Sequence, residues 1–163
     1  MFQSLNGFIF PGGSAQLPAS AEYIFRRVLR SNTLGDFIPL WGLCLGFEWL
    51  LKITTQNNDI LESNYVMNLS MPLVFTDQVA NSSLFANASD FILDSFSNFN
   101  VTMNNHFYGI SANGFQRNKI LKSFYRVLST NIDRDGVQFV STIESFRFPI
   151  VGTQWHPEKN LFE

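Results

Sequence analysis

The stretch LWGLCLGFEWL, residues 40–50, places the only cysteine of the chain between two glycines. Gly42, Cys44 and Gly46 follow an apolar run and precede a helical pattern, which is the form of a nucleophile elbow. Small neighbours let the backbone bend sharply, and the N-terminus of the following helix is expected to lower the pKa of the thiol. A buried structural thiol fits the same composition. The pattern therefore leaves nucleophile and structural thiol as equal alternatives.

The apolar patterns on both sides of this stretch predict an α/β fold. The order strand, helix, strand, helix favours parallel strands joined by crossover helices. The sequence DRDG predicts a hairpin turn between two later strands. We expect strands over residues 5–10, 37–41, 127–132, 137–143 and 149–155, and helices over 20–30, 45–53 and 117–125. The polar segment 56–103 is expected to hold only short strands and loops.

Composition bounds the class of protein. The 163 residues suit a single domain, 1–163, with 45% hydrophobic and 15% charged residues. A net charge of −2 with 11 Lys and Arg residues predicts no basic surface for nucleic acid. One cysteine excludes an internal disulfide and a thiolate zinc site, and the two histidines lack HExxH spacing, so no metal site is expected. The longest apolar run, 37–53, is interrupted by Pro39 and Glu48 and is too short to span a bilayer.

The N-terminal sequence MFQSLNGFIFPGG lacks the basic and long apolar regions of a signal peptide. It is expected to enter a core strand almost at once, which indicates missing sequence upstream. Four Asn-x-Ser/Thr sequons, at Asn68, Asn81, Asn87 and Asn100, are a mild excess over chance. They matter only if the chain enters a secretory route.

Two further motifs could supply chemistry to Cys44. His156 follows a predicted strand in GTQWHPE, and Glu158 is close enough in sequence to orient its imidazole if the turn is tight. Cysteine, histidine and glutamate together provide a nucleophile, a general base and an orienting carboxylate. The loop FPGGS, residues 10–14, can bring a backbone N–H to a substrate carbonyl, although Gly-Gly turns are common. His106, in NNHFYG, is on its own more typical of a solvated loop histidine.

Three separated segments, FIFPGGS, WGLCLGFEWL and GTQWHPEK, occur in the order and approximate spacing of the class I glutamine amidotransferase-like superfamily. Within it the chain resembles the γ-glutamyl hydrolases. Amidotransferase domains typically have Gly-His-Gln or Gly-Met-Gln after the cysteine and Phe before His-Pro-Glu. Here Phe47 and Glu48 follow Gly46, and Trp155 precedes His156, as in the hydrolases. The segments MPLVFT and NNHFYGIS are also similar to that family.

The resemblance implies a flavodoxin-like α/β sandwich with a mainly parallel central sheet. It also implies that the first strand and helix and the terminal helix of that fold are missing here. Carried over by position, the resemblance gives Cys44 as nucleophile, His156 as its proton-transfer partner, Glu158 as the third catalytic member, Gly13 and Leu45 as oxyanion donors, and Glu48, His106, Gln154 and Trp155 as substrate-binding residues. No metal and no organic cofactor is required.

The implied activity is hydrolysis of γ-glutamyl amide bonds in folate and antifolate poly-γ-glutamates. The implied partner is therefore this small-molecule substrate, with a homodimer as the assembly and no nucleic acid or membrane. The family is lysosomal or extracellular. Two alternatives stay open: a glutaminase or amidotransferase domain that passes ammonia to a partner, and a truncated relative without catalytic activity.

Overall fold

The computed structural model describes residues 4–159. Its strands are β1 (Phe8–Phe10), β2 (Leu40–Leu43), β3 (Glu62–Met71), β4 (Val74–Phe75), β5 (Thr102–Gly109), β6 (Tyr125–Ile132), β7 (Gln138–Ser145) and β8 (Ile150–Thr153). Its helices are α1 (Ala19–Thr33), α2 (Leu45–Thr55), α3 (Asp90–Asn98), α4 (Ala112–Arg117) and α5 (Lys119–Phe124), with the short 3-10 helix η2 (Asp77–Asn81).

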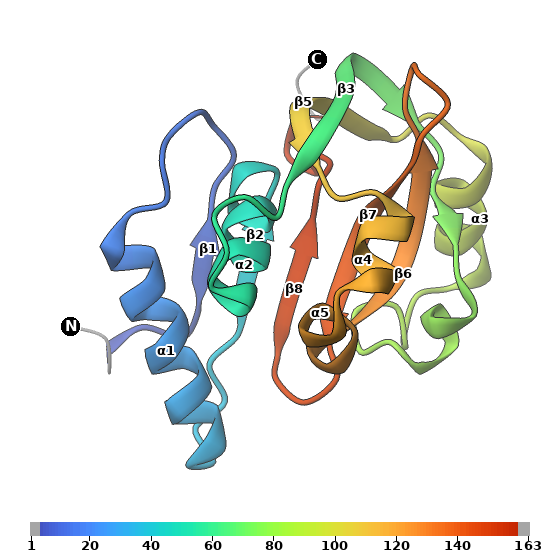
Figure 1. Cartoon of the computed structure of the whole chain (residues 1–163). Helices are drawn as coiled ribbons and strands as arrows, with labels where there is room; N and C mark the ends of the chain where they lie inside the picture. Colours follow the sequence, from blue (N-terminus) through green and yellow to red (C-terminus); the bar gives the residue numbers. More distant parts are fainter. Residues whose placement is uncertain (1–3, 160–163) are drawn as a thin grey trace.

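In the described part of the chain, six strands form one sheet in the order β1-β2-β8-β7-β6-β4. The first three are parallel neighbours, and the other three join them antiparallel. β3 and β5 form a separate antiparallel ribbon. Figure 1 shows α1 and α2 beside the parallel half, α3 at the opposite side, and the ribbon at the edge toward which β8 points. The ribbon therefore lies at the carboxyl ends of the parallel strands.

The helix that follows Cys44 is the centre of the hydrophobic core. Every residue of 45–51 is buried, because α2 is apolar on nearly all sides. Phe47 and Leu50 are fully buried against the sheet face that also carries Leu40 and Ile150. Burial of one such side chain favours folding by about 2–3 kcal/mol. The position of α2, and with it the position of Cys44, is thus fixed by the best-packed part of the molecule.

The predicted α/β class is confirmed, and the sheet is mixed. The parallel arrangement holds for β1, β2 and β8. The turn DRDG forms the predicted hairpin between β6 and β7, because Asp133 Oδ1 accepts hydrogen bonds from the amides of Asp135 and Val137. The short loop between β7 and β8 leaves no room for a crossover helix, so these strands pair antiparallel. Half of the sheet is therefore antiparallel, which is more than the sequence predicted.

Two local predictions were wrong. The segment 56–103 holds the long strand β3, the helix α3 and the start of β5 as well as loops. Register shifts and the positive φ of Asn68 interrupt β3 and obscure its alternation, and Ser89 caps α3 by accepting from the Ile92 amide. The predicted helix 117–125 is two short helices, because Asn118 is extended and its Oδ1 accepts from the first amides of α5.

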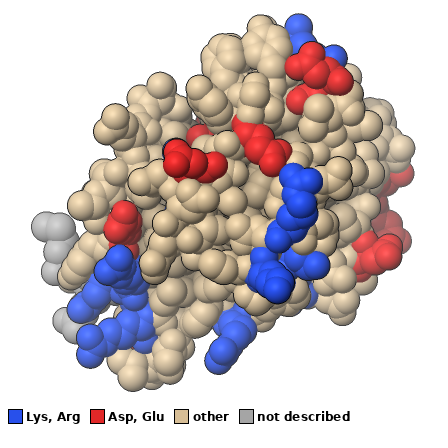
Figure 2. Space-filling model, in the orientation of Figure 1, with Lys and Arg blue, Asp and Glu red and all other residues tan. Residues whose placement is uncertain are grey.

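Charged side chains form no continuous basic surface on the face in Figure 2, where blue and red atoms lie in separate small groups. One basic group lies over α1 at the lower left. Among residues 4–159, no helix has both the length and the apolar character that crossing a bilayer requires.

Candidate active site

Three loops at the carboxyl ends of the parallel strands converge on Cys44. Gly12 and Gly13 follow β1, Cys44 follows β2, and His156 lies three residues beyond β8. The three strands are parallel and in register, so their ends meet at one edge of the sheet. This edge is where α/β sheets bind ligands. Residues more than a hundred positions apart in the sequence are brought together here.

Cys44 is the residue at which β2 turns into α2. Its backbone has φ 48° and ψ −103°, a strained conformation that residues other than glycine rarely adopt. Its N–H donates to the Thr153 carbonyl of β8 at 2.8 Å, and its carbonyl accepts from the Glu48 amide at 3.1 Å. Bonds on both sides hold the strained turn. The thiol therefore sits at the N-terminus of α2, as an elbow requires.

The two glycines beside Cys44 are needed because backbone meets backbone. A Cβ on Gly46 would lie 2.1 Å from the Phe10 carbonyl oxygen, and one on Gly42 would lie 2.6 Å from the Gly46 carbonyl oxygen. Neither neighbour is a flexible side chain that could swing aside. The Gly-x-Cys-x-Gly pattern thus reflects how closely α2 lies on β1 and β2.

His156 is held by β5 and by Glu158. Its amide donates to the Met103 carbonyl at 2.8 Å, and its Nδ1 lies 2.8 Å from Glu158 Oε1. The imidazole is 8% exposed, whereas the Glu158 side chain is 51% exposed. With the proton on Nδ1 donated to Glu158, Nε2 is the ring atom available for proton exchange. No motif pointed to Met103, whose role comes from the pairing of distant segments.

Gly12 is a site residue that the sequence motifs did not single out. A Cβ built on it would lie 2.6 Å from His156 Cε1 and 3.5 Å from Cys44 Cβ. The thiol-bearing residue and the imidazole therefore lie within 4 Å of one point. The signal was present in FPGGS, of which only Gly13 was expected to contribute. Gly13 has φ +144°, and its nearest neighbour at the Cβ position is Leu45 Cδ2 at 4.0 Å, so the two expected oxyanion donors lie side by side.

The electrostatics of the thiol differ from the sequence expectation. Burial, followed by the charge of Glu48, raises the pKa of the Cys44 thiol to about 12. The Leu45 amide hydrogen bond and the charge of Lys159 lower that pKa, but they do not offset the burial, because the side chain is only 4% exposed. The expectation that the helix N-terminus would dominate was therefore wrong. Cys44 rests as a neutral thiol, and thiolate formation requires a proton acceptor such as His156.

Glu48, Gln154 and Trp155, expected to bind substrate, are buried beside Cys44. Gln154 Nε2 donates to Glu48 Oε1 at 3.4 Å, and Trp155 Nε1 donates to Thr142 Oγ1 at 3.1 Å. Burial raises the pKa of the Glu48 carboxyl to about 7. The bonds that these side chains make in this structure hold the loop after β8 against the first turn of α2.

His106 lies on β5 and not in a loop. It is 4% exposed, and its ring packs against Phe139 with 5.4 Å between centroids. Burial lowers its pKa to about 4, and the charge of His156 acts in the same direction. His106 is thus a neutral imidazole within electrostatic range of the proposed base, which its position in an Asn-rich stretch did not suggest.

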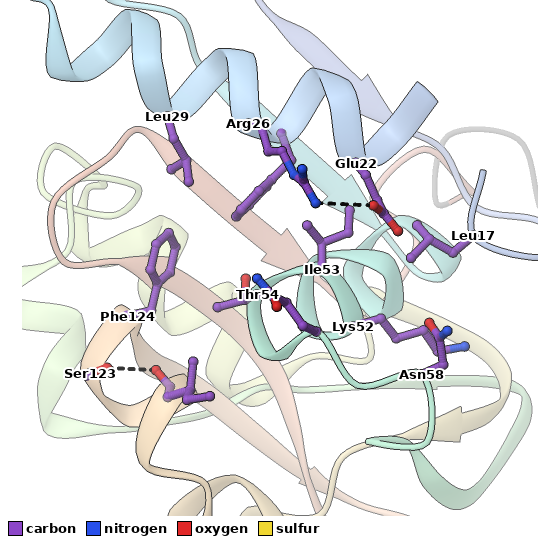
Figure 3. A pocket seen from close by; sticks show the side chains of 13 residues that line it. Leu17, Glu22, Arg26, Leu29, Lys52, Ile53, Thr54, Asn58, Ser123 and Phe124 are labelled. Carbon is purple, nitrogen blue, oxygen red and sulfur yellow. Dashed lines mark hydrogen bonds and ion pairs between the residues drawn. The ribbon is translucent and has the colours of Figure 1, made fainter. Parts of the chain in front are cut away.

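The described residues hold no group of three or more His, Cys, Asp or Glu side chains that could bind a metal ion. A cavity of about 400 Å³ lies between α1, α2 and α5, lined by apolar side chains such as Leu29, Ile53 and Phe124. Figure 3 shows Glu22 and Arg26 paired at its rim, and Lys52 from the last turn of α2. The cavity is therefore at the end of α2 opposite Cys44, and it contains no predicted site residue.

The assembled site can be compared with known families. The sequence model described as Glutamine amidotransferase class-I matches residues 4–163. The chain belongs to this family. A crystal structure of a GMP synthase subunit from Thermoplasma acidophilum aligns with it at a TM-score of 0.51 and 13% identity, over 96% of this chain and 65% of that chain. At this identity the likeness shows a shared amidotransferase-type fold.

Curated relatives of this class-I amidotransferase chain carry a more specific name. The chain is 39% identical over 168 residues to γ-glutamyl hydrolase B of Dictyostelium discoideum, and 41% identical over 170 residues to probable γ-glutamyl hydrolase 3 of Arabidopsis thaliana. It is 37% identical over 168 residues to the human γ-glutamyl hydrolase. These matches cover 99–100% of this chain and 48–52% of the relatives. The chain thus spans about half the length of the curated relatives it matches.

Proposed function

We propose that this chain carries the cysteine-dependent hydrolytic site of a γ-glutamyl hydrolase. The observation that carries the proposal is the convergence at Gly12, where Cys44 and His156 lie within 4 Å of one point and Glu158 holds the imidazole at 2.8 Å. A strained nucleophile, a buried base and an orienting carboxylate form the arrangement that acyl transfer needs. The names of the relatives, over nearly the whole of this chain, support the γ-glutamyl bond as the one cleaved.

The reaction proceeds in two acyl-transfer steps. His156 Nε2 takes the Cys44 proton as the sulfur attacks the amide carbonyl, and the amides of Gly13 and Leu45 donate to the developing oxyanion. The carbon–nitrogen bond then breaks while His156 gives its proton to the leaving amine, which leaves a γ-glutamyl thioester. Water attacks the thioester with His156 as base, and the thiol is restored. Each oxyanion donor contributes roughly 3–4 kcal/mol in comparable sites.

The proposed substrate is a pteroyl-poly-γ-glutamate. Support comes from Phe47 and Glu48 after the elbow and Trp155 before His156, which resemble the hydrolases and not the ammonia-transferring domains. The test is incubation of the chain with pteroyl-penta-γ-glutamate, followed by separation of the shortened products. We expect Cys44→Ala to abolish shortening and Lys122→Met, an exposed change on α5, to leave it unchanged. Shortening that survives in Cys44→Ala would rule out the proposed nucleophile.

A glutaminase is the second candidate, because the matching family and the aligned structure are of the amidotransferase type. Ammonia release from glutamine without shortening of the pteroyl substrate would favour it. A non-catalytic relative would show neither reaction, and its Cys44 would react with iodoacetamide in the same way in His156→Asn as in wild type. The two assays and the alkylation together separate the three alternatives.

We also propose that the protein acts in a lysosomal or extracellular compartment as a homodimer. All four sequon asparagines, Asn68, Asn81, Asn87 and Asn100, are exposed, which supports access for glycosylation. Expression behind a secretory leader should give a chain that loses mass on glycosidase treatment, and sedimentation gives its oligomeric state.

A further inference from the structure

The electrostatics around Cys44 create a problem for the proposed substrate. A poly-γ-glutamate carries an α-carboxylate on every residue, and four covalent bonds separate it from the γ-carbonyl carbon that Cys44 attacks. Two carboxyl groups, those of Glu48 and Glu158, already act on Cys44. A further negative charge brought beside them is repelled unless a cation is within reach. The site therefore needs a positive side chain at this edge of the sheet.

The cations of the chain can be placed one by one, because all 11 Lys and Arg residues lie within residues 4–159. Most lie on the helices or at the amino-end edge of β8: Arg26, Arg27 and Arg30 on α1, Lys52 in the last turn of α2, Arg117, Lys119 and Lys122 on α4 and α5, Arg126 beside Glu144, and Arg147 in the loop before β8. Arg134 lies in the β6–β7 turn, where it donates to the Met67 carbonyl at 2.9 Å and stacks on Tyr65.

Lys159 is the remaining cation, and it belongs to the same turn as His156 and Glu158. Its amide lies 3.3 Å from the His156 carbonyl, to which it donates, so the turn places the lysine backbone one tight loop beyond the base. The residue is half-buried at the carboxyl-end edge. Its charge is the one positive side-chain charge among the groups that act on the Cys44 thiol, and it opposes Glu48 and Glu158 there.

We propose that Lys159 binds the α-carboxylate of the glutamyl residue whose γ-amide Cys44 attacks. This assignment rests on the proposed function. The turn fixes the lysine backbone close to His156, and its four-carbon stem spans the distance between the reacting carbonyl and the α-carboxylate. The same charge attracts any small anion that approaches the thiol.

The direct test pairs a change in the enzyme with a change in the substrate. Pteroyl-γ-glutamyl-glutamate is compared with its analogue in which the α-carboxyl of the attacked residue is a carboxamide. We expect wild type to prefer the carboxylate by about ten- to hundredfold in kcat/KM, the range for a hydrogen bond to a charged group. Lys159→Met should bring that ratio close to one, Lys159→Arg should keep most of it, and Lys122→Met should behave as wild type. Equal ratios in wild type and Lys159→Met would overturn the proposal.

A second measurement needs no turnover. Alkylation of Cys44 by iodoacetate, an anion, is compared with alkylation by neutral iodoacetamide. The ratio of the two rates should fall about fivefold or more in Lys159→Met and stay in Lys159→Arg. Absence of turnover on either pteroyl substrate contradicts the proposed function, and the anion site is then decided by this ratio. A ratio that Lys159→Met leaves unchanged overturns the site.

Discussion

Glu48 is buried one helical turn after Cys44 and controls the charge at the thiol. Its pKa is raised to about 7 by burial, so the carboxyl is neutral at pH 5 and negative at pH 8. When negative, it adds to the burial that raises the pKa of Cys44. We expect Glu48→Gln to react with iodoacetamide at Cys44 about tenfold faster than wild type at pH 8, and at the wild-type rate at pH 5.

The stability of the same variant provides the control. A carboxyl whose pKa is raised in the folded state keeps its proton after the unfolded chain has lost it. The free energy of unfolding of wild type therefore falls as the pH rises from about 4.5 to about 7. Glu48→Gln should be more stable relative to wild type at pH 8 than at pH 5, by up to about 3 kcal/mol in urea unfolding. An equal difference at both pH values would contradict the assignment of Glu48 as the titrating group.

Gly12 sets the distance between the loop after β1 and His156. In Gly12→Ala the new methyl carbon would lie 2.6 Å from His156 Cε1, so the imidazole must move away from Cys44. We expect kcat/KM on the pteroyl substrate to fall at least about a hundredfold, because misplaced catalytic groups lose rate steeply. Gly35→Ala is the matched control: φ is +96° with nothing within 4 Å, so it should lower stability by about 1 kcal/mol and keep activity. Equal losses of activity in the two variants would argue against a steric role for Gly12.

At the scale of elements, the contact of α2 with β1 depends on one absent methyl group. A Cβ on Gly46 would lie 2.1 Å from the Phe10 carbonyl oxygen, so Gly46→Ala must separate α2 from β1. We expect a loss of more than about 3 kcal/mol in the free energy of unfolding. Gly114→Ala in α4 should be neutral or stabilising by up to about 1 kcal/mol, because its close neighbour is the mobile end of Glu62 and alanine favours helix. Urea unfolding of both variants measures the difference, and similar values would contradict the backbone-contact explanation.

The same elements show what the sequence could predict. β2, α2 and the β6–β7 hairpin were expected because apolar runs, two glycines and DRDG are local signals. β3 and β5 were missed because their ribbon depends on partners far along the chain, and bulges interrupt the alternation of β3. α3 was missed because its apolar residues are partly exposed and present no complete face. Local chemistry therefore predicted the elements that carry Cys44, but not the ribbon that supports His156.

At the scale of the whole molecule, the site is assembled by the register of three parallel strands. The motifs around Cys44, His156 and Gly13 were recognised in the sequence, and their proximity followed from the rule that such strands end at one edge. The burial of the thiol did not follow from any motif. It depends on β5, which reaches His156 through the Met103 carbonyl, and on the complete packing of α2. For this reason the predicted direction of the pKa of Cys44 was wrong although its position was right.

The edge of the sheet determines how the molecule behaves at high concentration. Within residues 4–159, β1 pairs with β2 on one side only, and Ile9 on β1 is 63% exposed. An exposed apolar edge strand favours pairing with another chain. We expect Ile9→Lys to reduce self-association in sedimentation velocity at high protein concentration and to change the free energy of unfolding by less than about 0.5 kcal/mol. Ile132→Lys makes the same charge change at 58% exposure on β6, a strand with neighbours on both sides, so its association should match wild type. If both lysines reduce association equally, net charge and not the edge strand is responsible.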